Sequence, residues 1–310
     1  MTDGTTPPMP GAFSPDDIVR DVKQLPSAPK VLPRLKQLLS DTNSAMHEIV
    51  ALIRLDPGIA ARVLQTANSA YFNSKGVRCI MVDEAVQRVG YDEVYELVAY
   101  AVASQVLVRP LEAYGLDADT LWQSSVACAI AAELLAVRTN QDPNIAYTIG
   151  LLHRVGMVAI DEWALKQAPG LKLTPLSLPR EATEAERATL GFTQAEVGGA
   201  LLRHWNFPPA MFEPVRRQYA PNASSGHAKM ASLLLAAKWL RSAVNHLPLQ
   251  QPPLPEPSQL VSLGILPVDL QGMVGEVEAQ LADVSSLLAI ASTKAPFNRA
   301  DFPSATFDHA

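Results

Sequence analysis

The residues of this sequence with the clearest chemical potential are His153 and Arg154, which adjoin each other just before Gly156. An imidazole can hold a metal ion, whereas a guanidinium can bind phosphate or carboxylate through two parallel hydrogen bonds. The apolar stretch that begins at Ala146 leads directly into this pair and predicts a helix that delivers both side chains. The end of this helix is therefore the place to look for chemistry.

Each of these two residues also has a purely structural interpretation, which the sequence favours. His153 fits a core histidine whose ring nitrogens are satisfied by neighbouring groups, and the alternatives are a metal ligand or a contact to a small molecule. Arg154 fits a salt bridge to an acidic side chain such as Glu196 or Asp161. The alternative for Arg154 is a contact to a phosphate or a carboxylate, and it stays open.

Helices must position this pair, because apolar residues recur at helical spacing and no segment shows the alternation of a strand. Ser14-Pro15 and Asp56-Pro57 each place a capping residue before a proline at the first helical position. The predicted fold class is all-α. The expected organisation is a flexible tail over 1–13, an N-terminal helical lobe over 14–110, a second helical lobe over 111–246, and a Pro-rich segment with C-terminal helices that pack back over 247–310.

Composition excludes several classes of protein. The chain has 310 residues, 48% of them hydrophobic and 18% charged, so it can bury a sizeable core and is not a disordered chain. A net charge of -6 argues against non-specific binding of nucleic acid. Cys79 and Cys128 are expected to be buried thiols in a reducing compartment. Without a secretory signal or a run of about 18 apolar residues, the sequence predicts a soluble, cytoplasmic protein with no membrane segment.

An ordered series of short motifs runs through both helical blocks. In the first block the motifs are Leu25-Pro26-Ser27-Ala28-Pro29, Asp56-Pro57-Gly58-Ile59-Ala60-Ala61-Arg62-Val63-Leu64, Ala67-Asn68-Ser69-Ala70-Tyr71-Phe72 and Ala85-Val86-Gln87-Arg88-Val89-Gly90. In the second block they are Gly150-Leu151-Leu152-His153, Leu190-Gly191-Phe192, Ala195-Glu196-Val197-Gly198 and Leu201-Leu202-Arg203-His204-Trp205. With these motifs in this order, the chain resembles the HDOD family, the HD-related output domains of bacterial signalling.

The resemblance implies an all-α fold in two lobes, the second of them similar to HD-type metal phosphohydrolases. In catalytic relatives, histidines and a His-Asp pair hold divalent metals that activate water. The resemblance places these ligand positions at Gln123, His153, Arg154, Gln194, Gln218 and Tyr219. Only His153 is a competent ligand there, and Arg154 replaces the aspartate. The electrostatic repulsion between a guanidinium and a divalent ion about 4 Å away is roughly 8 kcal/mol at an effective dielectric constant of about 20.

The sequence therefore predicts a protein without catalytic activity, bound metal or cofactor. Gln123, Gln194 and Gln218 are expected to form a satisfied polar network in the former metal cavity, and hydrogen bonding to a small ligand is the alternative. A nucleotide sensor for a molecule such as cyclic di-GMP, with Arg154 and Arg203 as contacts, is the main alternative function. A metal-dependent phosphohydrolase is a more distant one.

A polar and aromatic turn, which includes Asn68, Ser69 and Tyr71, follows one of the predicted helices. Its structural interpretation is a helix C-cap with the aromatic ring packed beneath it, and the alternative is a contact between lobes or with a partner. The resemblance implies a regulatory module of signal transduction that acts through protein–protein interaction. Its expected partner is a sensor kinase, a response regulator or a cyclic di-GMP enzyme. The oligomeric state stays open.

Overall fold

Asp56 illustrates how the local sequence begins the helices of this protein. Its Oδ1 atom accepts a hydrogen bond of 2.9 Å from the backbone N–H of Ile59, and proline occupies the first position of α4 (Pro57–Ala67). Side-chain caps satisfy N–H groups that the first turn of a helix leaves free. Asp117, Asp142 and Thr193 cap α7 (Ala118–Arg138), α8 (Pro143–Leu152) and α11 (Gln194–His204) in the same way.

The computed structural model describes residues 13–21, 38, 45–73, 76–90, 93–94, 110–173, 179–205, 207–221, 226–244 and 254–292. Within these ranges the elements are helices, and the only β-type pairing is an isolated bridge between Leu111 and Leu116. The all-α prediction is confirmed. The sequence also predicts one helix after Leu25-Pro26 and another from Asp92 to Val108. Both lie outside the described residues, apart from 38, 93 and 94.

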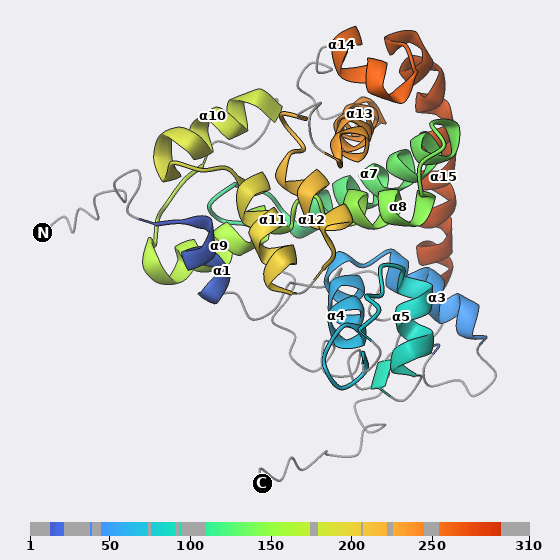
Figure 1. The fold of residues 1–310 in the computed structure, drawn as a ribbon, viewed down its shortest axis with the longest axis horizontal. Helices are drawn as coiled ribbons and strands as arrows, with labels where there is room; N and C mark the ends of the chain where they lie inside the picture. Colours follow the sequence, from blue (N-terminus) through green and yellow to red (C-terminus); the bar gives the residue numbers. More distant parts are fainter. Residues whose placement is uncertain are drawn as a thin grey trace, which may run out of the picture.

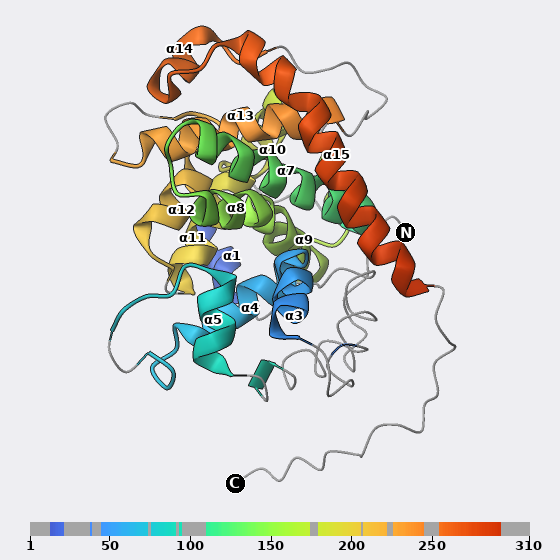
Figure 2. The same cartoon turned by 90° about the vertical axis from the view of Figure 1, so that its right-hand side faces the viewer.

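Helices α3 (Met46–Arg54), α4 and α5 (Val82–Val89) pack against one another and form the first group of helices. Ile49, Ile53 and Leu64 lie fully buried within it. In Figures 1 and 2 this group lies below the other helices, and α4 meets them at α8. The arrangement agrees with a two-lobed bundle.

Helix α7 lies at the centre of the second group. It packs against α8 and α13 (Ala228–Val244), while α11 packs against α9 (Val155–Gln167) and α12 (Pro209–Arg216). By length and composition alone, the part of α7 from Thr120 to Arg138 could cross a membrane, but 67% of its most apolar window is buried inside the protein. A core helix meets the same criterion, and α7 occupies the position of one. Helix α10 (Pro179–Leu190) precedes α11.

Helix α1 (Pro15–Asp21) belongs to the second group by its contacts, although the sequence assigned residues 14–110 to the N-terminal lobe. It packs against α11 and α9 because Ile18 and Val19 are buried there. Phe13, placed at the end of the expected flexible tail, forms an edge-to-face contact with Trp163 at 5.1 Å between ring centroids. The first described residues are therefore held by apolar contacts with helices that lie far away in the sequence.

The C-terminal helices cover one side of the second group. Helix α14 (Pro257–Leu260) and a 3-10 turn (Val261–Leu263) pack against α13, and α15 (Pro267–Ser292) packs against α13 and α7. Figure 2 shows α15 running obliquely across the other helices of the bundle. The ion pair between Arg138 and Glu276, 2.6 Å long, joins α7 to α15.

Candidate functional site

The turn between α8 and α9 carries His153 and Arg154. Helix α8 ends at Leu152 and α9 begins at Val155, so these two residues form the corner. Helix α9 approaches α11 closely at Gly156. A Cβ atom added there would overlap the carbonyl oxygen of Gln194 and lie 2.7 Å from the nitrogen of Gly198. This contact places the corner beside the first turn of α11.

His153 is a neutral, hydrogen-bonded histidine in the interior. Only 1% of it is exposed, its Nδ1 atom lies 2.6 Å from the carbonyl oxygen of Gly150, and its Nε2 atom lies 2.9 Å from Nη1 of Arg241. Arg241 can only donate, so Nε2 accepts and Nδ1–H donates to Gly150. Burial, followed by the charges of Arg241, Arg154 and Lys238, lowers the pKa of His153 well below its usual value. Both ring nitrogens are therefore occupied.

Three cationic side chains are buried near His153: 6% of Arg154, 3% of Lys238 and 5% of Arg241 remain exposed. The Lys238 Nζ atom lies 3.3 Å from the centroid of the Tyr219 ring and donates a hydrogen bond of 3.4 Å to the carbonyl oxygen of Gln218. Burial, followed by the charge of Arg241, lowers the pKa of Lys238 well below its usual value. We call Arg154, Lys238 and Arg241 the cationic cluster.

Arg154 has no hydrogen bond and no ion pair with any other described residue. The predicted salt bridge is wrong, because Glu196 pairs with Arg187 at 3.2 Å and Asp161 accepts a hydrogen bond of 2.8 Å from the N–H of Ala113. Burial, followed by the charge of Arg241, lowers the pKa of Arg154 to about 9, so the guanidinium is still charged at neutral pH. A charged guanidinium that is nearly buried therefore has no protein partner among the described residues.

Gln194 and Gln218 both lie against the cluster with no exposed surface. The Gln194 Nε2 atom donates a hydrogen bond of 2.8 Å to the hydroxyl oxygen of Tyr219, and the Gln218 Nε2 atom donates one of 2.9 Å to the carbonyl oxygen of His153. The Oε1 atoms of both glutamines are buried and have no hydrogen-bond partner among the described residues. The expected polar network exists here, but it is only half satisfied.

Gln123, by contrast, is exposed on α7 and takes no part in the cluster. The expected network of three glutamines therefore does not include Gln123. The α7 side chain that faces the cluster is Cys128, whose thiol interacts electrostatically with Arg241, Lys238 and Arg154. Five residues along a helix turn the side chain by about 140°, so Gln123 points away when Cys128 points inward.

Glu186 on α10 is the carboxylate that interacts with the cluster, and 1% of it is exposed. Its two oxygens accept hydrogen bonds of 3.0 Å from the hydroxyl group of Tyr114 and 2.8 Å from the N–H of Gln194. Burial raises the pKa of Glu186 to about 7. At neutral pH this group therefore supplies less than one full negative charge.

The sequence motifs do not mark Lys238, Arg241 or Glu186 as site residues. The signal was present for the first two, because they are charges three residues apart on α13, a helix whose other buried residues are almost all apolar. Residues three apart lie on the same face of a helix. A lysine and an arginine on the buried face of an apolar helix require a polar destination in the core.

The residues around His153 do not fit a divalent metal ion. Both nitrogens of His153 already have partners, and the neighbouring side chains are Arg154, Lys238 and Arg241 rather than carboxylates or imidazoles. Among the described residues, no group of three or more His, Cys, Asp or Glu side chains is arranged to hold a metal. The donors that converge at this position suit an anion.

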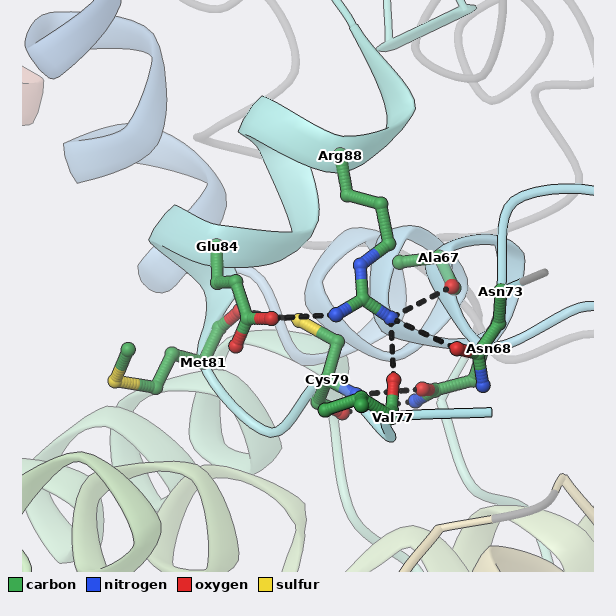
Figure 3. A network of polar contacts seen from close by, with 8 residues as sticks. All are labelled: Ala67, Asn68, Asn73, Val77, Cys79, Met81, Glu84 and Arg88. Carbon is green, nitrogen blue, oxygen red and sulfur yellow. Dashed lines mark hydrogen bonds and ion pairs between the residues drawn. The ribbon is translucent and has the colours of Figure 1, made fainter. Parts of the chain in front are cut away.

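A second polar network fixes the loop that follows α4. Asn68, the C-cap residue of α4, donates a hydrogen bond of 2.8 Å from Nδ2 to the carbonyl oxygen of Cys79 and accepts one of 2.7 Å at Oδ1 from the Cys79 N–H. Figure 3 shows this pairing, in which a side-chain amide imitates a backbone partner. The two ends of the loop are thus joined.

Arg88 on α5 completes this network (Figure 3). Its Nη1 atom donates hydrogen bonds of 2.7 Å to the carbonyl oxygen of Val77, 3.4 Å to Oδ1 of Asn73 and 3.5 Å to the carbonyl oxygen of Ala67. Its Nη2 atom pairs with Glu84 at 2.5 Å. The guanidinium is therefore well satisfied, and it holds several points of the loop to α5. We call the described residues from Asn68 to Ile80 the clamped loop.

Tyr71 lies on the clamped loop with 86% of its surface exposed. The expectation that this ring packs beneath the helix cap is wrong, and Ser69 is only partly buried. The Tyr71 ring touches Phe72 edge-to-face at 4.8 Å between centroids, and Val77 on the same loop is 62% exposed. Asn68 and Arg88 bind the backbone of this loop, and the Tyr71 ring on the same loop is exposed.

Arg203 lies apart from the cationic cluster. Its side chain is 55% exposed, and its Nη2 atom pairs with Oδ1 of Asp16 at 2.8 Å. The expected joint contact of Arg154 and Arg203 with one ligand is therefore not formed, because Arg203 is at the far end of α11 from Gln194.

Known proteins resemble this chain in sequence and in fold. An uncharacterized protein from Treponema pallidum (strain Nichols) is 28% identical over 233 residues, which is 73% of this chain and 43% of that protein. This chain therefore spans less than half the length of that relative. The solved structure of the MmoQ response regulator from Methylococcus capsulatus (Bath) superimposes with a TM-score of 0.65 and 20% identity, over 82% of this chain and 99% of that chain.

A virulence factor from Campylobacter jejuni superimposes with a TM-score of 0.61 and 18% identity, over 86% of this chain and 100% of that chain. At these identities the two structures show a shared fold. The family model of the HDOD domain matches residues 25–221, well over half of the sequence. This match agrees with the helical order and the motifs described above. The chain belongs to the HDOD family.

Proposed function

We propose that this protein is a non-catalytic, cytoplasmic module of bacterial signal transduction that regulates another signalling protein by binding it. Membership of the HDOD family supports a role in signalling. The fold shared with a response regulator supports the same role. The exposed aromatic ring on the clamped loop supports the proposal that this regulation works through binding to another protein.

The exposure of Tyr71 on the clamped loop is the observation that carries this proposal. An aromatic ring that is 86% exposed gains a large buried area when a partner covers it. Because Asn68 and Arg88 already fix the loop, little conformational entropy is lost on binding. Val77 adds a second exposed apolar side chain to the same surface.

The cationic cluster supports the non-catalytic part of the proposal. A hydrolytic HD site needs metals to activate water, and the side chains around His153 repel divalent ions. Incubation with zinc, manganese and iron, followed by desalting and inductively coupled plasma mass spectrometry, tests this point. We expect less than one metal ion per ten chains, and stoichiometric metal would contradict it.

The partner that we propose is a sensor kinase, a response regulator or a cyclic di-GMP enzyme. The test uses immobilised protein, cell lysate and mass spectrometry, followed by affinity measurement with the purified candidate. Tyr71→Ala should weaken binding by roughly 30-fold, the effect of losing an interface hot spot. Val137→Ala is the control, since Val137 is 68% exposed at the end of α7, outside the clamped loop. Equal binding by the wild-type protein and Tyr71→Ala would refute this surface.

The alternative of a nucleotide sensor that uses Arg154 and Arg203 together loses its basis, because these two residues are not neighbours. A metal-dependent phosphohydrolase is disfavoured by the charges around His153. The specific observation that still favours a small ligand is the unpaired guanidinium of Arg154.

A further inference from the structure

We propose that Arg154, Lys238 and Arg241 form a binding site for a phosphate-class oxyanion, either free phosphate or the phosphate group of a nucleotide. The site lies where an HD enzyme would hold its metal ions. The protein side chains there are cationic, whereas those that hold a metal ion are neutral or anionic. It is independent of the clamped loop, and it goes beyond the proposed function by assigning this protein a ligand.

The unpaired guanidinium of Arg154 is the first reason. Its donors have no partner among the described residues, although only 6% of the residue is exposed. Buried charges in proteins are almost always paired, because an unpaired one carries a large desolvation penalty. A guanidinium presents a planar set of donors that matches two oxygens of a phosphate.

The surplus of positive charge is the second reason. Arg154, Lys238 and Arg241 interact electrostatically with one another, and Glu186 is a carboxylate that opposes them. Both oxygens of Glu186 are already committed to Tyr114 and to the N–H of Gln194. An oxyanion with one or two charges would offset the positive charge of the cluster, whereas a metal ion would increase the repulsion.

The unpartnered oxygens of Gln194 and Gln218 narrow the chemistry of the ligand. Both Oε1 atoms are buried acceptors without a donor among the described residues. A ligand for this site should therefore carry negative oxygens for the cations and an O–H or N–H donor for the amides. Hydrogen phosphate and nucleoside monophosphates have both, whereas a fully deprotonated sulfate has no donor to offer.

Tyr219 lies between the cluster and a pocket at the surface. This pocket of about 420 Å³ is lined by Tyr219, by the basic residues Arg187, Arg216 and Arg217, and by the acidic residues Glu184 and Glu196. On the inside, the hydroxyl group of Tyr219 accepts a hydrogen bond from Gln194 and its ring packs against Lys238. Tyr219 thus forms a wall shared by the pocket and the cluster, and in our proposal the ligand enters here.

The experiment is a thermal unfolding series in phosphate-free buffer at constant ionic strength. The wild-type protein is titrated with inorganic phosphate, with guanosine monophosphate, with cyclic di-GMP and, as an anion control, with sulfate. Saturating ligand should raise Tm by about 5 °C, the shift expected at roughly a hundred times Kd. A shift with phosphate identifies the free ion, whereas a shift with a nucleotide alone identifies the base as part of the ligand.

Three variants locate the site. Arg154→Met and Lys238→Met should abolish the shift, and Arg203→Met should keep it, since Arg203 pairs with Asp16 on the surface. Circular dichroism checks that each variant is folded. A shift in Arg154→Met equal to that of the wild-type protein, or no shift with any of the three phosphate compounds, would overturn the proposal. An equal shift with sulfate would also overturn it. Tyr71→Ala should keep the shift, so failure of the partner surface leaves this result unchanged.

Discussion

Two arginines of this protein, Arg88 and Arg154, stand in opposite situations. Arg88 is partly exposed, yet its guanidinium has three hydrogen-bond acceptors and a carboxylate partner. Arg154 is almost completely buried, yet no described residue pairs with it. Arg88, which water can reach, is therefore hydrogen-bonded to the protein. Arg154, which water reaches much less, has no protein partner among the described residues.

The difference teaches that the two networks have different tasks. The network around Arg88 is complete by itself, so its effect is to fix the clamped loop and the position of Tyr71. The network around Arg154 has free donors and free acceptors at once, so it becomes complete only with an additional molecule. A satisfied network indicates a structural role, and an unsatisfied buried one calls for a specific explanation.

The largest effect should come from Gly156→Ala, which forces apart the helices that bring Arg154 beside Gln194. A Cβ atom there would collide with the backbone of Gln194 and Gly198, which cannot rotate away. We expect a loss of about 3 kcal/mol in the free energy of unfolding, measured by urea titration. Gly275→Ala on α15 is the control, because its Cβ would meet no described atom within 4 Å. Equal losses in both variants would show that the α9–α11 contact is not tight.

Exchanging each arginine for methionine tests the comparison directly. Arg88→Met should destabilise the protein by about 2 kcal/mol, because it leaves the acceptors of the clamped loop unpaired. Arg154→Met should stabilise the ligand-free protein by about 1 kcal/mol, because it removes an unpaired buried charge that Arg241 repels. Urea titrations in phosphate-free buffer measure both. A destabilised Arg154→Met variant would mean that Arg154 has a structural partner after all.

The pH dependence of stability sharpens the contrast at Lys238. Burial, followed by the charge of Arg241, lowers the pKa of Lys238 well below its usual value. Between the lowered pKa and the ordinary one, the folded protein therefore binds fewer protons than the unfolded chain. The free energy of unfolding must then rise with pH in that range, by about 1.4 kcal/mol per pH unit for one proton. Lys238→Met should lack this part of the slope.

Chemical denaturation at pH values from 7 to 10 compares the two proteins. The contributions of other groups that titrate in both, such as Glu186, largely cancel in the difference between the curves. Parallel curves would show that Lys238 has an ordinary pKa in the folded protein. The cluster would then be more hydrated than its burial indicates.

The smallest effect on stability should follow from Tyr71→Ala. The Tyr71 ring is 86% exposed, so its removal should change the free energy of unfolding by less than about 0.5 kcal/mol while partner binding is lost. Phe72→Ala is the matched comparison, since Phe72 packs against the core and should cost more. A loss at Tyr71 as large as that at Phe72 would assign both rings to the core.

The sequence by itself determined the helices of the described chain. Ser14 before Pro15 and Asp56 before Pro57 began helices where predicted, because a cap acts on N–H groups only two or three residues away. The family and the corner at His153 and Arg154 followed from motifs of the same short range. Such signals depend on neighbours along the chain and not on how the chain folds back.

Only the tertiary structure decided which buried residues meet. Arg241 lies 88 positions from His153 in the sequence and donates to its ring, and α1 packs on α11 and α9 rather than on its neighbours in the chain. The orientation of α7 leaves Gln123 exposed, and the packing of the loop after α4 leaves Tyr71 exposed. Apolar periodicity identifies the buried face of a helix, but it does not identify the residues that this face contacts, because the hydrophobic effect has no direction. The pairing of polar groups depends on distances between atoms, and only the packing of the helices sets these distances.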